Sequence, residues 1–288
     1  MHRLLGNPSL RTLVAPLLAG RRALLRRRWQ AEQNQLDRLI GLFAEDPVLR
    51  LDDFRGSFAL SASSHLLGRI ALEGFYEPEL AAVCRAHLDP ARDAVDVGAN
   101  VGFFSVMMAR ELPGRRVLAV EPTPGALSRL HGNLARNGVA GQVVVVEGAA
   151  AATSGHFDLS VIEGREEYAS LGPLVHSAIA GSAHQTVRVS TTPLDDLVEA
   201  QGLEPGFLKI DVEGAEAAVL QGAARTLAKH RPVVMAEIND DMLRQQGSSA
   251  RAVLALLTDA GYALSDPSHP GQPPGLRPYG DVLAIPRR

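Results

Sequence analysis

Two groups of acidic residues, each following a short apolar segment, are the first candidates for chemistry in this chain. The first is Asp96, which opens the string Asp-Val-Gly-Ala-Asn-Val-Gly at residues 96–102 after an apolar run from Ala94. A strand, a glycine turn and a helix N-terminus form a site for a nucleotide-like ligand, because glycines let the backbone approach it and the helix offers free N–H groups. A carboxylate two residues before the first glycine can hold an ammonium group of such a ligand.

A second carboxylate fits the same kind of ligand. Glu121 lies 23 residues after Gly98 and ends a second apolar segment, Val117 to Val120. An acid there accepts hydrogen bonds from both hydroxyls of a ribose, as in nicotinamide-dependent dehydrogenases. Three features favour S-adenosylmethionine (SAM) instead: the acid before the first glycine, the absence of Gly-x-Gly-x-x-Gly spacing, and an antiparallel strand pair expected at the end of the chain.

The second acidic group lies in the string Leu-Lys-Ile-Asp-Val-Glu-Gly-Ala-Glu, residues 208–216. Asp211, Glu213 and Glu216 follow an apolar strand, and open α/β sheets bind ligands at the carboxyl ends of their strands. Acids near a helix start also stabilise the helix itself, and we expect Glu216 to have only that role. Asp211 or Glu213 is therefore the candidate base for the proton of a hydroxyl group.

A divalent metal is a second way to activate a hydroxyl group. Asp211 and Glu237 end neighbouring strands, and with Asn239 they can form an all-oxygen metal site. No close spacing of ligands supports such a site. We therefore expect catalysis by a base without a metal.

These residues need a sheet that brings strand ends together. From Ala94 onwards, short apolar segments alternate with amphipathic helical ones, which predicts an α/β fold with a doubly wound, Rossmann-like parallel sheet. The last two strands, Tyr262 to Ser265 and Val282 to Ile285, have no crossover helix between them, so we expect them to be antiparallel.

Other segments predict elements around this sheet. Residues 150–192 interrupt the alternation and indicate a hairpin insertion. The chain after Gly214 predicts one helix that ends before Pro232, and Ser248 is expected to cap the next. Before the sheet, we expect a strand from Phe54 to Leu60, and helices lined by Leu36, Ile40 and Phe43 and spanning Glu79 to Leu88.

Several strings together resemble FkbM-family SAM-dependent methyltransferases. They are Asp96 to Phe104, Val120 to Pro122, Tyr168 to Leu171, Thr192 to Asp196 and Leu208 to Glu216. The resemblance covers about residues 70–240. It implies a seven-stranded methyltransferase sheet and an enzyme that usually methylates a hydroxyl on a sugar, a glycolipid or a secondary metabolite.

The resemblance also implies roles for particular residues. Those that would line the cofactor are Asp96, Gly98, Ala99, Asn100, Gly102, Phe103, Glu121 and Pro122. Those expected to cover it or to contact the acceptor are Tyr76, Glu77, Tyr168 and Ser170. Many methyltransferases place an acid after the third strand for the adenine amine. The matching stretch here is Glu147, Gly148 and Ala149, so Glu147 or backbone groups are expected to serve.

Some methyltransferase classes are excluded by their absent residues. The chain has no Asn/Asp-Pro-Pro-Tyr string for amide or adenine N-methylation, and its one cysteine, Cys84, does not follow proline as a cytosine-attacking thiol would. Its second and last lysine, Lys229, lies at the far end of a helix, so a Lys-Asp-Lys-Glu tetrad cannot form. A SAM-binding protein without transfer activity and a nicotinamide-dependent reductase remain as alternatives.

Composition sets the remaining expectations. The 288 residues have a net charge of −3, which does not favour nucleic acid, and the single cysteine fits a reducing, cytoplasmic location. No apolar run is long enough to span a membrane. Seven arginines and no acid make residues 1–31 a basic arm that fits weak contact with anionic lipid.

We expect an N-terminal extension at residues 32–90 and the methyltransferase domain at 91–288, acting on a small molecule that carries a hydroxyl group.

Overall fold

The computed structural model describes residues 45–161, 170–171, 185–269, 271–274 and 279–287. Their centre is a seven-stranded sheet in the order β12-β13-β11-β10-β3-β4-β5. Along the chain these strands are β3 (Asp93–Val97), β4 (Val117–Glu121), β5 (Val143–Glu147), β10 (Pro205–Ile210), β11 (Val233–Asn239), β12 (Tyr262–Ser265) and β13 (Tyr279–Pro286). The predicted doubly wound sheet is confirmed.

Strand directions place the candidate residues at one edge of the sheet. The strands β3, β4, β5, β10 and β11 are parallel, and β13 is antiparallel to both β11 and β12, as predicted. The chain proceeds from β3 to β4 on one side, whereas β10 pairs with the other side of β3. The carboxyl end of β3 therefore lies at the point where strand order reverses, and ligands of open α/β sheets bind there.

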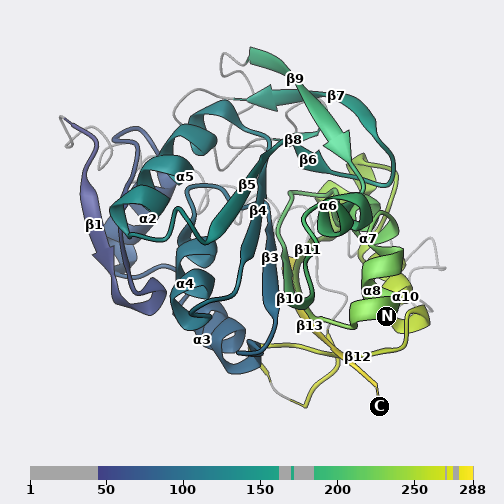
Figure 1. The fold of residues 1–288 in the computed structure, drawn as a ribbon. Coiled ribbons are helices and arrows are strands. Elements are labelled where there is room, and N and C mark those ends of the chain that lie inside the picture. The colour runs from purple at the N-terminus through teal and green to yellow at the C-terminus, as the bar shows by residue number, and fades with distance from the viewer. Residues whose placement is uncertain (1–44, 162–169, 172–184, 270, 275–278, 288) are drawn as a thin grey trace, which may run out of the picture.

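Helices cover both faces of the sheet (Figure 1). One face carries α3 (Pro78–His87), α4 (Phe103–Glu111) and α5 (Pro124–Arg136), and the other carries α6 (Leu194–Ala200), α7 (Glu216–Gln221), α8 (Ala224–His230) and α10 (Ala250–Asp259). Side chains alternate between these faces along each strand. In β3, Ala94 packs in the core on the α4 side and Val95 in the core on the α7 side. None of the helices in the described ranges is both long and apolar enough for a membrane span.

The N-terminal extension shares the core on the α4 side. Its described elements are β1 (Val48–Leu51), the 3-10 helix η1 (Asp52–Phe54), β2 (Gly56–Ala59) and α2 (His65–Glu73), followed by α3. The ring of Phe54 lies 5.2 Å from that of Phe103 at the start of α4, and the Ala59 N–H donates to Asn133 of α5 at 2.7 Å. The extension therefore supports the helix that follows the glycine turn.

One predicted strand of this region is shorter in the structure, and two predicted segments lie outside the described residues. The strand predicted from Phe54 to Leu60 is shorter, because Phe54 belongs to η1. The basic arm at 1–31 and the helix expected around Leu36, Ile40 and Phe43 lie outside the described residues.

The hairpin insertion is confirmed. The strands β7 (Gly155–Val161) and β9 (Gln185–Thr192) pair antiparallel, and β6 (Ala149–Ala150) and β8 (Ser170–Leu171) complete a second, four-stranded sheet. Figure 1 shows this sheet at the end of the molecule beyond β5.

The single helix predicted after Gly214 was wrong, because the chain forms α7 and α8 with a break at Gly222. A Cβ at Gly222 would lie 2.0 Å from the backbone oxygen of Ala151, so only glycine fits there. Asp195, at the start of α6, accepts hydrogen bonds from the N–H groups of Arg225 and Thr226 and so supplies a new cap for α8.

Two smaller differences lie further along the chain. The residue that caps α10 is Ser249, one position after the predicted Ser248, and its hydroxyl accepts from the Ala252 N–H. A short helix, α9 (Asp240–Gln245), was not predicted.

Candidate active site

The glycine turn after β3 and the acidic turn after β10 touch through their backbones. Gly98 has φ +80°, and a Cβ there would lie 1.7 Å from the backbone oxygen of Asp211. The Asp211 N–H donates to the Val97 carbonyl at 3.0 Å. Glycine is required at position 98 both for its dihedral angle and for this close approach.

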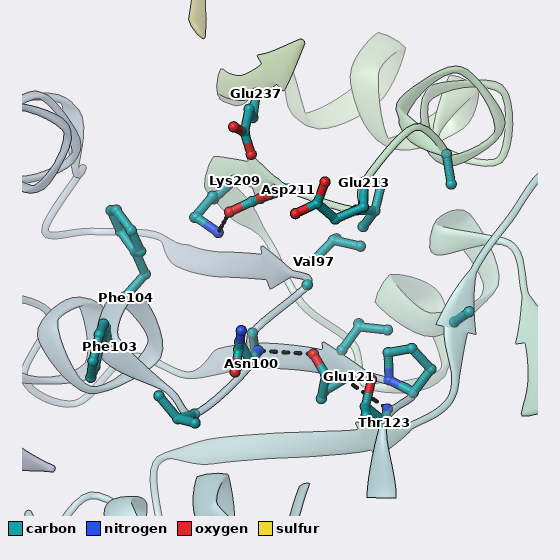
Figure 2. Close-up of a pocket in the computed structure, with 18 of the residues that line it drawn as sticks. Val97, Asn100, Phe103, Phe104, Glu121, Thr123, Lys209, Asp211, Glu213 and Glu237 are labelled. Carbon is teal, nitrogen blue, oxygen red and sulfur yellow. Dashed lines mark hydrogen bonds and ion pairs between the residues drawn. The ribbon is translucent and has the colours of Figure 1, made fainter. Parts of the chain in front are cut away.

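Glu121, at the end of β4, is held by the glycine turn after β3 and by the backbone just after β4. One of its carboxylate oxygens accepts from the Asn100 N–H and the other from the Thr123 N–H, each at 2.8 Å (Figure 2). The side chain is 5% exposed, and burial raises its pKa against the opposing effect of these hydrogen bonds. The acid is thus fixed in orientation and retains lone pairs for further donors.

A cavity of about 290 Å³ joins the two strand ends. Asn100, Glu121 and Thr123 lie on one side of it, and Lys209, Asp211, Glu213 and Glu237 lie on the other (Figure 2). Predicted site residues that line it are Tyr76, Glu77, Gly98, Ala99, Asn100, Phe103, Glu121, Pro122, Ala149, Asp211, Glu213, Glu237 and Asn239. Most of the predicted site is therefore brought together in one place.

Asp96 is not among the residues that line this cavity. It is fully buried, its Oδ2 accepts from the Ser105 hydroxyl at 2.6 Å, and its Oδ1 lies 3.6 Å from Lys209 Nζ. Burial raises its pKa, while Lys209 and Ser105 act in the opposite direction. Asp96 therefore lies next to Lys209, which lines the cavity, and does not line the cavity itself.

Two acids of the turn after β10 form a compact acidic group with Glu237 of β11. One oxygen from each of Asp211, Glu213 and Glu237 lies within 4.8 Å of the others. Burial acts to raise the pKa of Asp211, but the Lys209 ammonium and hydrogen bonds from Glu237 and Lys209 outweigh it and hold this pKa below its usual value. Glu213 has φ +52°, a left-handed conformation that is costly for a residue other than glycine. Asn239 caps α9 by accepting from the Met242 N–H.

The segment before α3 forms another wall. The Tyr76 ring lies 5.2 Å from that of Phe103, and Arg69 lies 5.4 Å from the Tyr76 ring centre. Glu77 has φ +38°, and its pKa is raised by burial and by the neighbouring Asp211. These placements agree with the expectation that Tyr76 and Glu77 adjoin the site.

Other predicted residues lie elsewhere. Gly102 begins α4 as its N-cap without lining the cavity, and Glu147 and Gly148 do not line it either. The Glu147 side chain is 67% exposed and lies 3.3 Å from His131. Ser170 is in β8, where only its backbone is described, and Tyr168 lies outside the described residues.

Sequence reasoning missed Lys209 and Arg69, which both line the cavity. One signal was available for Lys209. It is one of only two lysines among 29 basic residues, and it lies two positions before the candidate base. No comparable signal marked Arg69, which reaches the site from α2.

The comparison with protein families decides the identity of this fold. The model of the methyltransferase FkbM domain matches residues 96–264, which is more than half of the chain and includes both strand-end turns. The chain belongs to the FkbM methyltransferase family. The resemblance seen in the sequence is confirmed.

Curated relatives of this methyltransferase agree with that assignment. Methyltransferase sdnD of Sordaria araneosa is 30% identical over 199 residues, covering 59% of this chain and 73% of that protein. The 31-O-demethyl-FK506 methyltransferase FkbM of Streptomyces tacrolimicus is 28% identical, covering 62% and 75%. The 2-O-methyltransferase NoeI of Sinorhizobium fredii is 29% identical, covering 57% and 70%.

Among solved structures, methyltransferase FkbM of Methylobacillus flagellatus matches with a TM-score of 0.44 and 19% identity. The match covers 68% of this chain and 44% of that one, so this chain spans less than half of its length.

Proposed function

We propose that this methyltransferase transfers the methyl group of SAM to a hydroxyl group of a small molecule. The observation that carries the proposal is the single cavity that joins the glycine turn and Glu121 to the acids Asp211 and Glu213. A side chain suited to a ribose and a group that can accept a proton line the same cavity, which supports the proposal.

Glu121 suits the ribose of SAM. Its two oxygens are oriented by backbone N–H groups, and each keeps a lone pair for a ribose hydroxyl. Gly98 and Ala99 leave the backbone open to the methionine part, while Ala149 and Ala150 line the cavity near the end of β5, on the side proposed for adenine. Because Asp96 is buried with Lys209, we propose that it supports the turn and does not itself bind the methionine ammonium group.

The reaction is a direct displacement. A hydroxyl oxygen attacks the methyl carbon, the carbon–sulfur bond breaks, and its electron pair remains on the sulfur of S-adenosylhomocysteine. The hydroxyl proton passes to Asp211 or Glu213, which leaves a methyl ether. The sulfonium already activates the methyl group, so the protein mainly aligns the two reactants and accepts the proton.

Metal assistance is the competing route. The oxygen ligands of Asp211, Glu213 and Glu237 suit a hard cation such as Mg²⁺. However, Lys209 Nζ already lies 3.2 Å from Asp211 Oδ2, so the group has a cation of its own. We therefore propose base catalysis. Loss of activity in EDTA that magnesium restores would favour the metal.

The names of two relatives support a proposal for the acceptor. These names describe O-methylation, one of a 31-O-demethyl compound and one at a 2-O position. We propose the same type of acceptor here, a hydroxyl on a sugar, a glycolipid or a secondary metabolite. We also propose a cytoplasmic location, a basic arm at 1–31, an extension at 32–90 and a methyltransferase domain at 91–288.

Labelled methyl transfer tests this function. The protein is incubated with SAM carrying a labelled methyl group and a metabolite extract, and the labelled product is identified by mass spectrometry. A methyl ether is expected. SAM-binding protein that labels nothing would support the non-catalytic alternative, and copurified NAD would support the reductase.

A further inference from the structure

Lys209 connects the two strand ends on which the proposed site is built. Its register partner across the sheet is Asp96, and Asp211 follows it by two residues, just after the end of β10. Its Nζ lies 3.6 Å from Asp96 Oδ1, 3.2 Å from Asp211 Oδ2 and 4.8 Å from the centre of the Phe104 ring. The side chain is 7% exposed, so this ammonium group is held almost entirely by protein atoms.

The surroundings of Lys209 are strongly acidic. A second, smaller cavity lies beside the first, and its described lining contains Lys209 together with the carboxylates Glu77, Asp211, Glu237 and Asp281. Lys209 is the one cationic residue among those lining residues. Carboxylates gathered in a partly buried site need a nearby positive charge, because their mutual repulsion is poorly screened there.

We propose that the ammonium group of Lys209 is the resident cation of this site and takes the place that a divalent metal would otherwise occupy beside Asp211, Glu213 and Glu237. It compensates the charge of Asp96 below and of Asp211 above. It also engages one oxygen of Asp211 and thereby fixes the orientation of the carboxylate.

In the reaction, Lys209 is a positioning residue. It holds Asp211 in place, and Asp211 is one of the two residues proposed to receive the proton. Only this part of the inference rests on the proposed function. The presence of a resident cation is a property of the folded protein and can be tested without an acceptor.

Binding of Mn²⁺ alone tests the inference. Free Mn²⁺ is measured by electron paramagnetic resonance during titration of wild type, Lys209→Met and Lys209→Arg. Wild type and Lys209→Arg are expected to show no saturable site at the acidic group. Lys209→Met is expected to gain one site per chain, at least about tenfold tighter than any wild-type binding, because a unit of positive charge has been removed.

Further variants locate the gained site. Adding Asp211→Asn to Lys209→Met should abolish it, whereas Lys229→Met, which removes the exposed lysine at the end of α8, should bind like wild type. If Lys209→Met folds poorly because Asp96 is left buried and uncompensated, the double variant Asp96→Asn/Lys209→Met removes that charge as well.

Two results would overturn the inference. One is a wild-type Mn²⁺ site that disappears in Asp211→Asn, and the other is a folded Lys209→Met or double variant that gains no site. Methyl transfer is not measured, so a failure of the proposed function would leave this result unaffected. A wild-type metal site would equally leave methyl transfer in place.

Discussion

Glu121 holds the backbone around it, and we propose that it also binds the ribose of SAM. Its oxygens fix the backbone at Asn100 and Thr123, and the residue lines the cavity in which the ribose is proposed to bind. A hydrogen bond to a charged group contributes about 1.5–3 kcal/mol, which is roughly a tenfold to hundredfold change in affinity.

We therefore expect Glu121→Ala to weaken SAM binding at least about tenfold, as measured by calorimetry. Asp259→Ala, an exposed acid at the end of α10, is the control and should bind normally. Glu147→Ala, at the end of the neighbouring strand, should also bind normally, and a loss there would restore Glu147 to the adenine site. Unchanged affinity in a folded Glu121→Ala variant would remove Glu121 from the cofactor site.

Single substitutions also test which carboxylate acts as the base. Asp211→Asn should reduce methyl transfer by at least about a hundredfold while SAM still binds, because the amide cannot take the hydroxyl proton. Glu213→Gln is the matched comparison, since it removes the other candidate and leaves the Lys209–Asp211 contact intact. Full activity in both variants would contradict the assignment of a carboxylate base.

At the scale of elements, short-range patterns predicted what depends on neighbours in sequence. The apolar segments ending at Val97 and Val120 became β3 and β4, and the insertion at 150–192 became a hairpin. The predictions failed where a residue's structure depends on contacts with residues distant in sequence. The break between α7 and α8 depends on Asp195 and Ala151, and the burial of Asp96 depends on Lys209 in a strand over 100 residues later.

The α8 cap gives a test at this scale. Asp195→Ala should destabilise the protein by about 1–2 kcal/mol in urea unfolding, because two N–H groups at the helix start lose their acceptor. Asp196→Ala is the control. Its carboxylate is 49% exposed and pairs with Arg225 on the surface, so its loss should cost under about 1 kcal/mol. Equal costs would show that the cap does not stabilise α8.

At the scale of the whole molecule, two buried acids hold their protons to a higher pH in the folded state than in the unfolded chain. Burial raises the pKa of Glu216 from 4.5 to about 7, and one of its oxygens has no hydrogen-bond partner among the described residues. The pKa of Asp281 is raised to about 7, mainly by burial and then by Glu77. Acids with raised pKa values stabilise the fold while protonated, and this stabilisation is lost as pH rises through the folded value.

The stability that Glu216 and Asp281 contribute should therefore be lost between about pH 4.5 and pH 7 and stay absent above that range. The expected contribution of a buried acid such as Glu216 is at most about 1.4 kcal/mol for each pH unit within the window. Glu216→Gln cannot ionise, so its stability relative to wild type should improve from pH 5 to pH 8 in urea unfolding. A constant difference between the two proteins across this range would contradict the raised pKa.

The scarcity of lysine has a practical consequence for handling the enzyme. With Lys209 enclosed between two carboxylates, Lys229, the other lysine of the sequence, is the lysine that amine-reactive dyes and surface linkers can reach. Lys229 lies in the last turn of α8, just before β11 begins, so it is at the edge of the sheet opposite the cavity. A label or support attached there would lie at the opposite edge of the sheet from the residues that line the cavity.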